Sequence, residues 1–290
     1  MANLKEIRER ISSVGSTMQI TSAMKMVSAA KLKRAQNAIV QMRPYAEKLQ
    51  EILSNVSGSL NASENKYSAE REVKKGLIIA VASNRGLAGA FNNNIIKESS
   101  RIIAENDEVS FEVLGLGKKS YDHFRKGSYH SNDSFGNTYA ALFDDLNFNY
   151  VSSIAEDVMN RYVKGDYDIV YVVYNSFKNA GVQIIRTEQF LPIVASESDE
   201  SSSAVEYIFE PNKETIVEDL IPKSLKIQLY KAILDSHASE HGARMTAMHK
   251  ATDNASELQK ELKLTYNKAR QAAITAEILE IVGGAEALNS

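Results

Sequence analysis

Two histidines have the clearest metal-ligand spacing in this sequence. His237 and His241 stand four residues apart in "HASEH", where a helix would place both imidazoles on one face. A zinc site needs at least one further protein ligand. His249 lies about two helical turns further on, at an unsuitable spacing. We therefore interpret the pair as solvent-facing histidines on a helix and predict no metal site.

A turn with two glycines is the second place where chemistry could be expected. The stretch "SNRGLAGAFN" follows an apolar run and contains Gly86 and Gly89. Its spacing matches neither the G-x-G-x-x-G fingerprint of dinucleotide binding nor the G-x-x-x-x-G-K-[ST] loop that binds phosphates. We interpret it as a turn that needs a flexible backbone. Arg85 could make a contact there, but its spacing assigns no role.

The remaining titratable residues form no catalytic pattern. Asp144 and Asp145 lie in a polar stretch without an obvious partner, and no serine has a G-x-S-x-G context. His123 and His130 are expected in loops or at the surface. The chain contains no cysteine, which excludes disulfides, thiolate metal sites and cysteine nucleophiles. We predict no catalytic, cofactor-binding or metal-binding residue.

Composition favours a globular protein whose charge is unevenly placed. The 290 residues are 43% hydrophobic and 24% charged, and the net charge of -3 is too small to indicate a highly charged partner. Residues 1–50, however, carry nine Lys or Arg against three Glu. This basic segment could face an acidic protein surface or nucleic acid, or it could be a solvated helix. It lacks the aromatic residues and motifs of nucleic-acid readers.

The sequence contains no targeting or membrane-spanning pattern. The start, "MANLKEIRER", has neither the apolar core of a signal peptide nor a transit-like composition. No apolar run approaches the roughly 20 residues of a membrane span. We expect any membrane association to be made through partners.

The elements that position these residues begin with a long helix at each end of the chain. Apolar residues over 4–18 and 32–53 recur at steps of three and four. A helix over about 4–56 would be roughly 80 Å long, and Pro44 would bend it or end its straight part. Pro222 suits a first helical turn, and a helix from there to Leu288 would measure roughly 100 Å. We expect the two rods to pair as an antiparallel coiled coil.

The middle of the chain alternates between strand and helix patterns. Such alternation predicts a small α/β layer with a largely parallel sheet, in which the last strand runs antiparallel to its neighbour across "KNAG". The predicted strands cover 76–84, 109–117, 167–177 and 182–193, and the predicted helices cover 91–106, "KKSYDHFRK" and 149–165.

These patterns predict an α/β fold class with two parts. Residues 1–57 and 211–290 form one shaft, a long antiparallel coiled coil of the N- and C-terminal helices, and residues 75–210 form a small Rossmann-like α/β domain. The end of the shaft is unusual, because apolar residues from Ile274 to Leu288 occur on more than one face of the helix. A surface helix keeps one face polar. Something other than this chain is therefore expected to cover that end.

Residues in this end segment resemble the γ subunits of F-type (F1Fo) ATP synthases of the bacterial type. The stretches "ARMTAMHKATDNASELQKELKLTYNKARQA", "ITSAMKMVSAAKLKRAQ", "RPYAEKL" and "VASNRGLAGAFNNNI" are similar to the same family. The similarity follows the chain in order and is dense at about 1–50, 77–97 and 243–288, but loose over 120–165. Within "ITAEILEIVGGAEA", the family signature is filled by Ile274, Thr275, Glu277, Glu280, Gly284, Ala285 and Ala287.

The resemblance implies the central rotor shaft of a rotary ATP synthase, with no active site of its own. The paired helices would stand, in one copy, inside a hexamer of three α and three β subunits. The α/β body would sit on the membrane c-ring beside the epsilon subunit. Proton flow would turn ring and shaft, and the asymmetric shaft would drive the β sites through their states. The protein would be peripheral, at the cytoplasmic face of the bacterial inner membrane, without a nucleic-acid partner.

The resemblance also assigns roles to individual residues. Arg270 and Gln271 match a pair that grips a loop of one β subunit, and Met24 and Arg244 match positions near an acidic β segment. Two further sets follow: Lys31, Lys33 and Arg34 as a basic surface for that segment, and Thr275, Glu277 and Glu280 as polar residues that hold the two helices in register. Met24 could instead be an ordinary packing residue of the coiled coil. Glu277 and Glu280 could instead be solvated residues of the helix surface.

Two other classes of function stay open at this stage. A nucleotide-binding α/β enzyme with helical dimerisation arms would bind nucleotide and form a compact oligomer, whereas a shaft would bind none and co-purify with α and β subunits. A coiled-coil scaffold for nucleic acid would show a strongly salt-dependent affinity for DNA. The absence of cysteine excludes the thiol switch of chloroplast relatives, which, with the start of the chain, leads us to expect a bacterial type.

Overall fold

The computed structural model divides the chain into two compact units. One comprises Met1–Ser28 with Met245–Ser290, and the other Ala29–Arg244. The two longest helices, α1 (Leu4–Ser57) and α6 (Lys213–Leu288), each contribute to both units. The described residues are 4–57, 66–68, 71–127, 129, 131, 135, 139, 142–143, 146–193 and 213–288.

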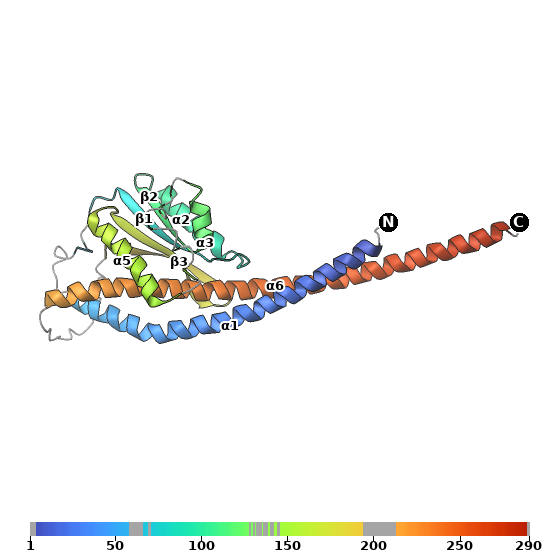
Figure 1. Cartoon of the computed structure of the whole chain (residues 1–290), viewed down its shortest axis with the longest axis horizontal. Helices are drawn as coiled ribbons and strands as arrows, with labels where there is room; N and C mark the ends of the chain where they lie inside the picture. Colours follow the sequence, from blue (N-terminus) through green and yellow to red (C-terminus); the bar gives the residue numbers. More distant parts are fainter. Residues whose placement is uncertain are drawn as a thin grey trace. The chain divides into compact units, whose positions relative to one another are not determined.

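A four-stranded sheet lies at the centre of the unit Ala29–Arg244 (Figure 1). The strand order is β2-β1-β3-β4; β1 pairs in parallel with β2 and β3, and β4 is antiparallel to β3. The predicted strands and the antiparallel connection across "KNAG" are thus confirmed. The strands are β1 (Lys75–Val81), β2 (Ser110–Leu116), β3 (Ile169–Asn179) and β4 (Val182–Leu191).

Helices cover both faces of this sheet because successive side chains of a buried strand point to opposite faces. Leu77 and Ile79 of β1 are fully buried in a cluster that includes residues of α5 (Phe148–Lys164) and α6. Ile78, between them, is equally buried in a second cluster with Ile95 of α2 (Phe91–Glu105) and Phe124 of α3 (Lys118–Phe124). The result is a three-layer arrangement of the Rossmann-like kind that the sequence predicts.

Local sequence signals set the ends of α5. The Asn147 side chain accepts a hydrogen bond from the Tyr150 backbone N–H at 2.9 Å, which caps the first turn. Gly165 follows the last turn with φ of 84°, a left-handed conformation that glycine adopts without strain. This helix carries six buried residues toward the sheet.

The start of α6 differs from the sequence prediction. The helix begins at Lys213, so Pro222 lies inside it rather than in its first turn. A proline inside a helix removes one backbone hydrogen bond. Leu225, Leu229 and Ile233, which follow within three turns, are buried in the core of the sheet domain. Their burial holds this stretch in helical form despite the proline.

In the other unit, the first part of α1 and the last part of α6 pair in antiparallel register. Arg8 Nη2 donates to Tyr266 Oη at 3.0 Å, and further along Thr252 Oγ1 donates to Thr21 Oγ1 at 2.8 Å. Ile7, Met248 and Ala255 are buried in the seam between the helices. The predicted antiparallel pairing is confirmed here. Among the described helices, none combines the length and low polarity needed to cross a membrane.

Candidate functional site: exposed partner surfaces and a filled crevice

The last turns of α6 expose apolar side chains. Near the start of α1, Arg8 is hydrogen-bonded to Tyr266 of α6. Beyond that point, every described side chain from 271 to 285 is exposed. The large apolar residues among them are 49% to 66% exposed, namely Ile274, Ile278, Leu279, Ile281 and Val282. A continuous exposed surface of this kind marks a site of protein interaction.

The polar residues predicted for this end are exposed as well. Arg270 and Gln271 precede the apolar turns, and both side chains face solvent. Thr275 Oγ1 donates to the Gln271 carbonyl of its own helix at 2.9 Å, and Glu277 and Glu280 are exposed. Their role in holding the two helices together stays a prediction, and their exposure does not support it.

Other residues make the contacts between the helices of this unit. Lys25 Nζ lies 3.3 Å from His249 Nδ1, and the Thr21–Thr252 hydrogen bond lies one turn away. Met24, a predicted partner contact, is half-buried. The sequence analysis did not identify these polar contacts, because a threonine or lysine inside a heptad pattern gives no sign of its partner. Several apolar residues of this unit are exposed: Ile20, Met26, Val27, Leu258 and Leu264.

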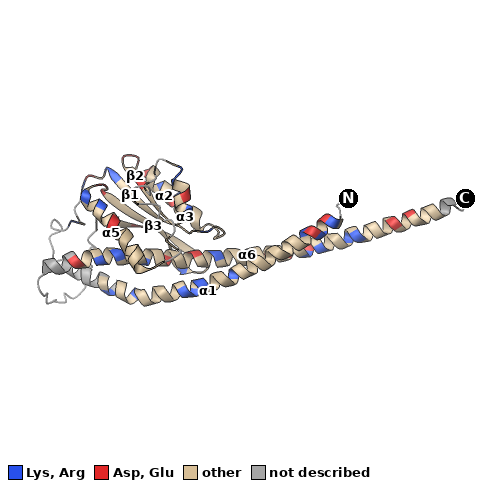
Figure 2. Cartoon of the chain, in the orientation of Figure 1, with Lys and Arg blue, Asp and Glu red and all other residues tan. Residues whose placement is uncertain are grey.

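The predicted basic surface lies on α1 within the unit Ala29–Arg244. Lys31, Lys33 and Arg34 are all exposed, and the lysines and arginines of α1 are visible in Figure 2. The structure therefore leaves this surface available for an acidic partner.

Arg244 differs from this group because it is buried. It is only 7% exposed. Its Nη1 lies 2.5 Å from Glu240 Oε1, and its Nη2 donates to the Arg85 carbonyl at 3.1 Å. Nε and Nη2 both lie 3.4 Å from the Gly86 carbonyl oxygen. Arg244 thus joins α6 to the turn after β1 in its own chain, and a direct partner contact stays a prediction that this burial does not favour.

The interpretation of His237 and His241 as solvent-facing residues is wrong. His241 is buried, and its Nε2 lies 3.0 Å from His237 Nε2. The ring of His237 stacks on Phe143, with centroids 5.7 Å apart. The heptad-like sequence of α6 did not reveal this burial, because the sheet domain covers a second face of the helix there. Within the described residues, no group of three or more His, Cys, Asp or Glu could hold a metal ion.

Hydrogen bonding sets the proton positions in this histidine pair. The guanidinium of Arg244 can only donate, so the His241 Nδ1 at 3.4 Å from its Nη1 is the acceptor. The His241 proton is then on Nε2 and is donated to His237 Nε2. Burial lowers the pKa of His237 to about 4 and that of His241 to about 3, and the nearby positive charges of Arg244 and Lys31 act in the same direction. Both rings are therefore neutral at neutral pH.

The same region fills the crevice in which a sheet of this type would bind a ligand. In open α/β sheets that position lies beyond the carboxyl ends of the strands, where the chain changes direction, here between β1 and β3. Ala243 of α6 packs there against Ala88 and Phe91, and Asn175 Nδ2 donates to the Phe91 carbonyl at 3.3 Å. Because the chain's own helix occupies this place, the nucleotide-binding enzyme is not favoured.

The turn itself has the backbone that its sequence predicts. Gly89 has φ of 57°, and Leu87 has φ of 62°, which is unusual for a residue with a side chain. Ser83 Oγ donates to the Arg85 carbonyl at 2.6 Å, and Ser83 N donates to Asn92 Oδ1 at 2.9 Å. The predicted flexible turn is thus a tightly bonded one. Its role within the described structure is to contact α6.

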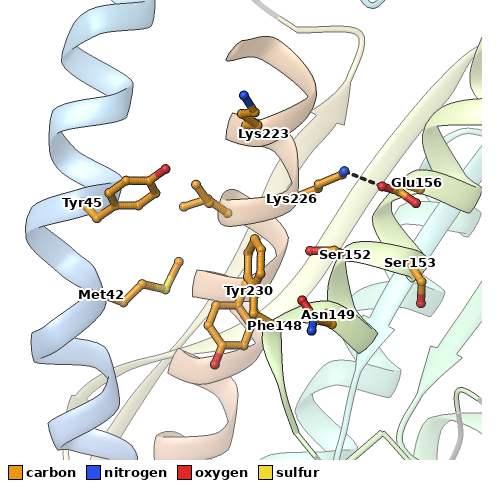
Figure 3. Close-up of a pocket in the computed structure, with 11 residues that line it drawn as sticks. Met42, Tyr45, Phe148, Asn149, Ser152, Ser153, Glu156, Lys223, Lys226 and Tyr230 are labelled. Carbon is orange, nitrogen blue, oxygen red and sulfur yellow. Dashed lines mark hydrogen bonds and ion pairs between the residues drawn. The ribbon is translucent and has the colours of Figure 1, made fainter. Parts of the chain in front are cut away.

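A groove of about 660 Å³ lies between α1, α5 and α6 (Figure 3). Aromatic and apolar side chains from all three helices line it, including Tyr45, Phe148 and Tyr230, and Lys226 pairs with Glu156 at its side. The sequence analysis did not identify this groove, because its residues come from three separate parts of the chain.

Comparison with known proteins agrees with the geometry. The sequence model of the ATP synthase family matches residues 3–288. The ATP synthase gamma chain of Flavobacterium johnsoniae is 60% identical over 290 residues and covers 100% of both chains. That of Cytophaga hutchinsonii is 56% identical over 299 residues with the same coverage.

Solved structures show the same fold. A chain of the Euglena gracilis mitochondrial ATP synthase has a TM-score of 0.69 at 22% identity, covering 98% of this chain and 94% of that one. A chain of the central stalk and c-ring structure of the Tetrahymena thermophila enzyme has a TM-score of 0.58 at 25% identity, covering 80% of this chain and 99% of that one.

Together with these relatives, the four-stranded α/β sheet and the exposed apolar turns of α6 indicate a central-stalk subunit of a rotary ATP synthase. This class agrees with the solved structures that share the fold. The chain belongs to the ATP synthase gamma chain family. It is accordingly a component of a membrane-associated complex.

Proposed function

We propose that this chain is the non-catalytic rotor shaft that couples proton translocation through a membrane c-ring to ATP synthesis and hydrolysis at α3β3 catalytic sites. One copy would stand in each complex. The exposed apolar end of α6 carries this proposal, since five large apolar side chains on successive turns require a cover that the described chain does not supply. An apolar sleeve of α and β subunits is such a cover.

Different surfaces of the chain suit different partner subunits. Lys31, Lys33 and Arg34 present a basic surface that suits an acidic β segment. Exposed ion pairs of this kind are each worth at most about 1 kcal/mol, which suits contacts that break on every turn. The α/β body would contact the epsilon subunit and the c-ring. The complex would place the chain at the cytoplasmic face of the bacterial inner membrane.

Arg270 and Gln271 are the residues that we propose to grip one β subunit. Both are exposed at the start of the apolar turns, where a guanidinium and an amide can bond to carboxylates and carbonyls of a partner. We expect Arg270→Ala with Gln271→Ala to lower coupled ATPase turnover about tenfold in the assembled complex, equivalent to about 1.4 kcal/mol. Steady-state ATPase assays on purified complexes provide the measurement.

A neighbouring pair supplies the matched control for this experiment. Asn267 and Lys268 also combine an amide with a cation and are exposed on the same helix. Asn267→Ala with Lys268→Ala is expected to leave turnover within twofold. Full turnover in the Arg270 and Gln271 variant, with assembly intact, would remove the gripping role. Failure of the wild-type chain to co-purify with α and β subunits would remove the shaft itself.

A further inference from the structure

The edge strand β4 is the surface whose role the proposed shaft function does not explain. Among the residues that the structure describes, β4 is the last strand in the order β2-β1-β3-β4, so only one of its sides is paired. Residues 183–189 pair with β3 without interruption, and the register shifts lie beyond both ends of this stretch. The opposite side therefore presents a regular row of backbone N–H and C=O groups, the arrangement that recruits another strand.

Side chains on this edge give it little protection against pairing. Proteins usually protect an edge strand with lysine, proline or a bulge, but β4 is ten residues long and contains neither lysine nor proline. Val182, Ile184 and Ile185 are 48%, 42% and 37% exposed. Three β-branched residues at a free edge favour an added strand over open solvent.

The charges on one face of β4 indicate which side chains an added strand would carry. Val182, Ile184 and Arg186 alternate along β4 and so share a face. Arg186 is exposed, and its guanidinium makes no hydrogen bond or ion pair within the part of the chain that the structure describes. Glu188, two residues on, already accepts a hydrogen bond from Tyr174 at 2.6 Å. A second copy of this strand would therefore bring no free carboxylate to Arg186.

We propose that, in the assembled complex, the free edge of β4 pairs with an extended strand of a partner subunit. That strand places apolar side chains against Val182 and Ile184 and a carboxylate against Arg186. This inference rests on the proposed function, because the partner is a subunit of the same complex. It assigns to the sheet domain an interface made by backbone hydrogen bonds, distinct from the apolar end of α6.

Amide hydrogen exchange tests the pairing directly. In an edge strand, alternate N–H groups point toward β3 and away from it. We expect every second amide over 183–187 to exchange rapidly in the isolated chain and at least about 100-fold more slowly in the complex. The intervening amides, already bonded to β3, should be slow in both. Unchanged exchange in a complex that has assembled would overturn this inference while leaving the shaft function standing.

Two variants identify the side-chain contribution. Ile184→Lys introduces the charge that natural edges use against pairing, and Arg186→Glu reverses the charge of the expected contact. We expect both to abolish the alternating protection in the complex. Val163→Lys on α5, where the valine is 40% exposed, and Arg186→Lys are the matched controls and should preserve it. Protection that instead rises with concentration in the isolated chain would indicate a second copy as the occupant and would also overturn the proposal.

Discussion

At the scale of single residues, Arg244 joins two distant parts of the sequence. It donates from α6 to carbonyls of the turn at 85–86, and Glu240 balances its charge one helical turn away. Burial raises the pKa of the Glu240 carboxyl, and the Arg244 cation opposes that effect. The pair is therefore a buried and mutually dependent one, in which loss of either member leaves the other uncompensated.

Removal of Arg244 should accordingly destabilise the folded chain. We expect Arg244→Ala to lower the free energy of unfolding by about 3–5 kcal/mol, since a buried carboxylate and two carbonyls lose their donor. Arg244→Met combined with Glu240→Leu should recover most of this loss. Chemical denaturation of the isolated chain measures both. Arg270→Ala, at an exposed site, should change stability by no more than about 0.5 kcal/mol, and an equal effect at both arginines would contradict the structural role of Arg244.

The histidine pair, in which His241 is buried and His237 half-buried, makes the stability of the fold depend on pH. An unfolded histidine has a pKa of 6.5, whereas His237 and His241 have pKa values of about 4 and 3 in the fold. The unfolded chain takes up these protons at higher pH than the folded chain. The contribution of the neutral histidines to the free energy of unfolding is therefore fully present above about pH 6.5 and decreases as the pH falls toward 4. The decrease is up to about 1.4 kcal/mol per pH unit for each histidine.

Unfolding curves between pH 7 and pH 4.5 measure this dependence. We expect His237→Gln with His241→Gln to flatten the decline in stability over this range, because glutamine takes up no proton. His249→Gln, on the exposed part of α6, serves as the control and should leave the slope as in the wild type. An unchanged slope in the double variant would show that the pair is not buried in neutral form.

At the scale of elements, the approach of the β3–β4 turn to α6 depends on one glycine. A Cβ atom at Gly242 would lie 3.2 Å from Ala180 Cα and 3.3 Å from Phe177 Cε2. These distances are tight but allow a small shift. Glycine inside a helix otherwise costs about 1 kcal/mol relative to alanine, so its presence in α6 has a packing reason.

Substitution at Gly242 should separate these two effects. We expect Gly242→Ala to be near neutral, because its gain in helix propensity offsets the crowding. Gly242→Val should lower the free energy of unfolding by about 1–3 kcal/mol through overpacking. Thermal and denaturant unfolding provide the comparison. Gly283→Val, where nothing lies within 4 Å of the added Cβ, should show no such loss; a similar loss there would assign the effect to the helix rather than to the contact.

At the scale of the whole molecule, the last turns of α6 expose apolar side chains that we propose a partner covers. We expect Ile278→Gln with Ile281→Gln to leave the stability of the isolated chain within about 0.5 kcal/mol, since both isoleucines are exposed. Binding to isolated α and β subunits should weaken at least about 100-fold, as two buried isoleucines contribute about 1.5–3 kcal/mol each. Calorimetric titration measures this affinity. Wild-type affinity in the double variant would contradict the proposal that α and β subunits cover the end of α6. Val163→Gln is the control and should leave the affinity unchanged.

The sequence by itself determined the order and kind of the elements. Strands such as Ile169–Asn179 are apolar and β-branched, and the terminal helices carry steps of three and four, so local periodicity was sufficient to predict them. The exposed end of α6 was predicted for the same reason, because apolar residues on several faces of a helix are visible without knowledge of its neighbours.

Only the tertiary structure decided which side chains are buried where α6 meets the sheet domain. His237 and Arg244 look like polar residues of a surface helix, but they contact Phe143 and Arg85, which lie far earlier in the chain. The free edge of β4 likewise follows from strand order rather than from the strand's own residues. The periodicity of a sequence predicts which residues share a face of one helix or strand. The burial of a side chain and the pairing of a strand edge depend instead on which other elements the fold packs against that face.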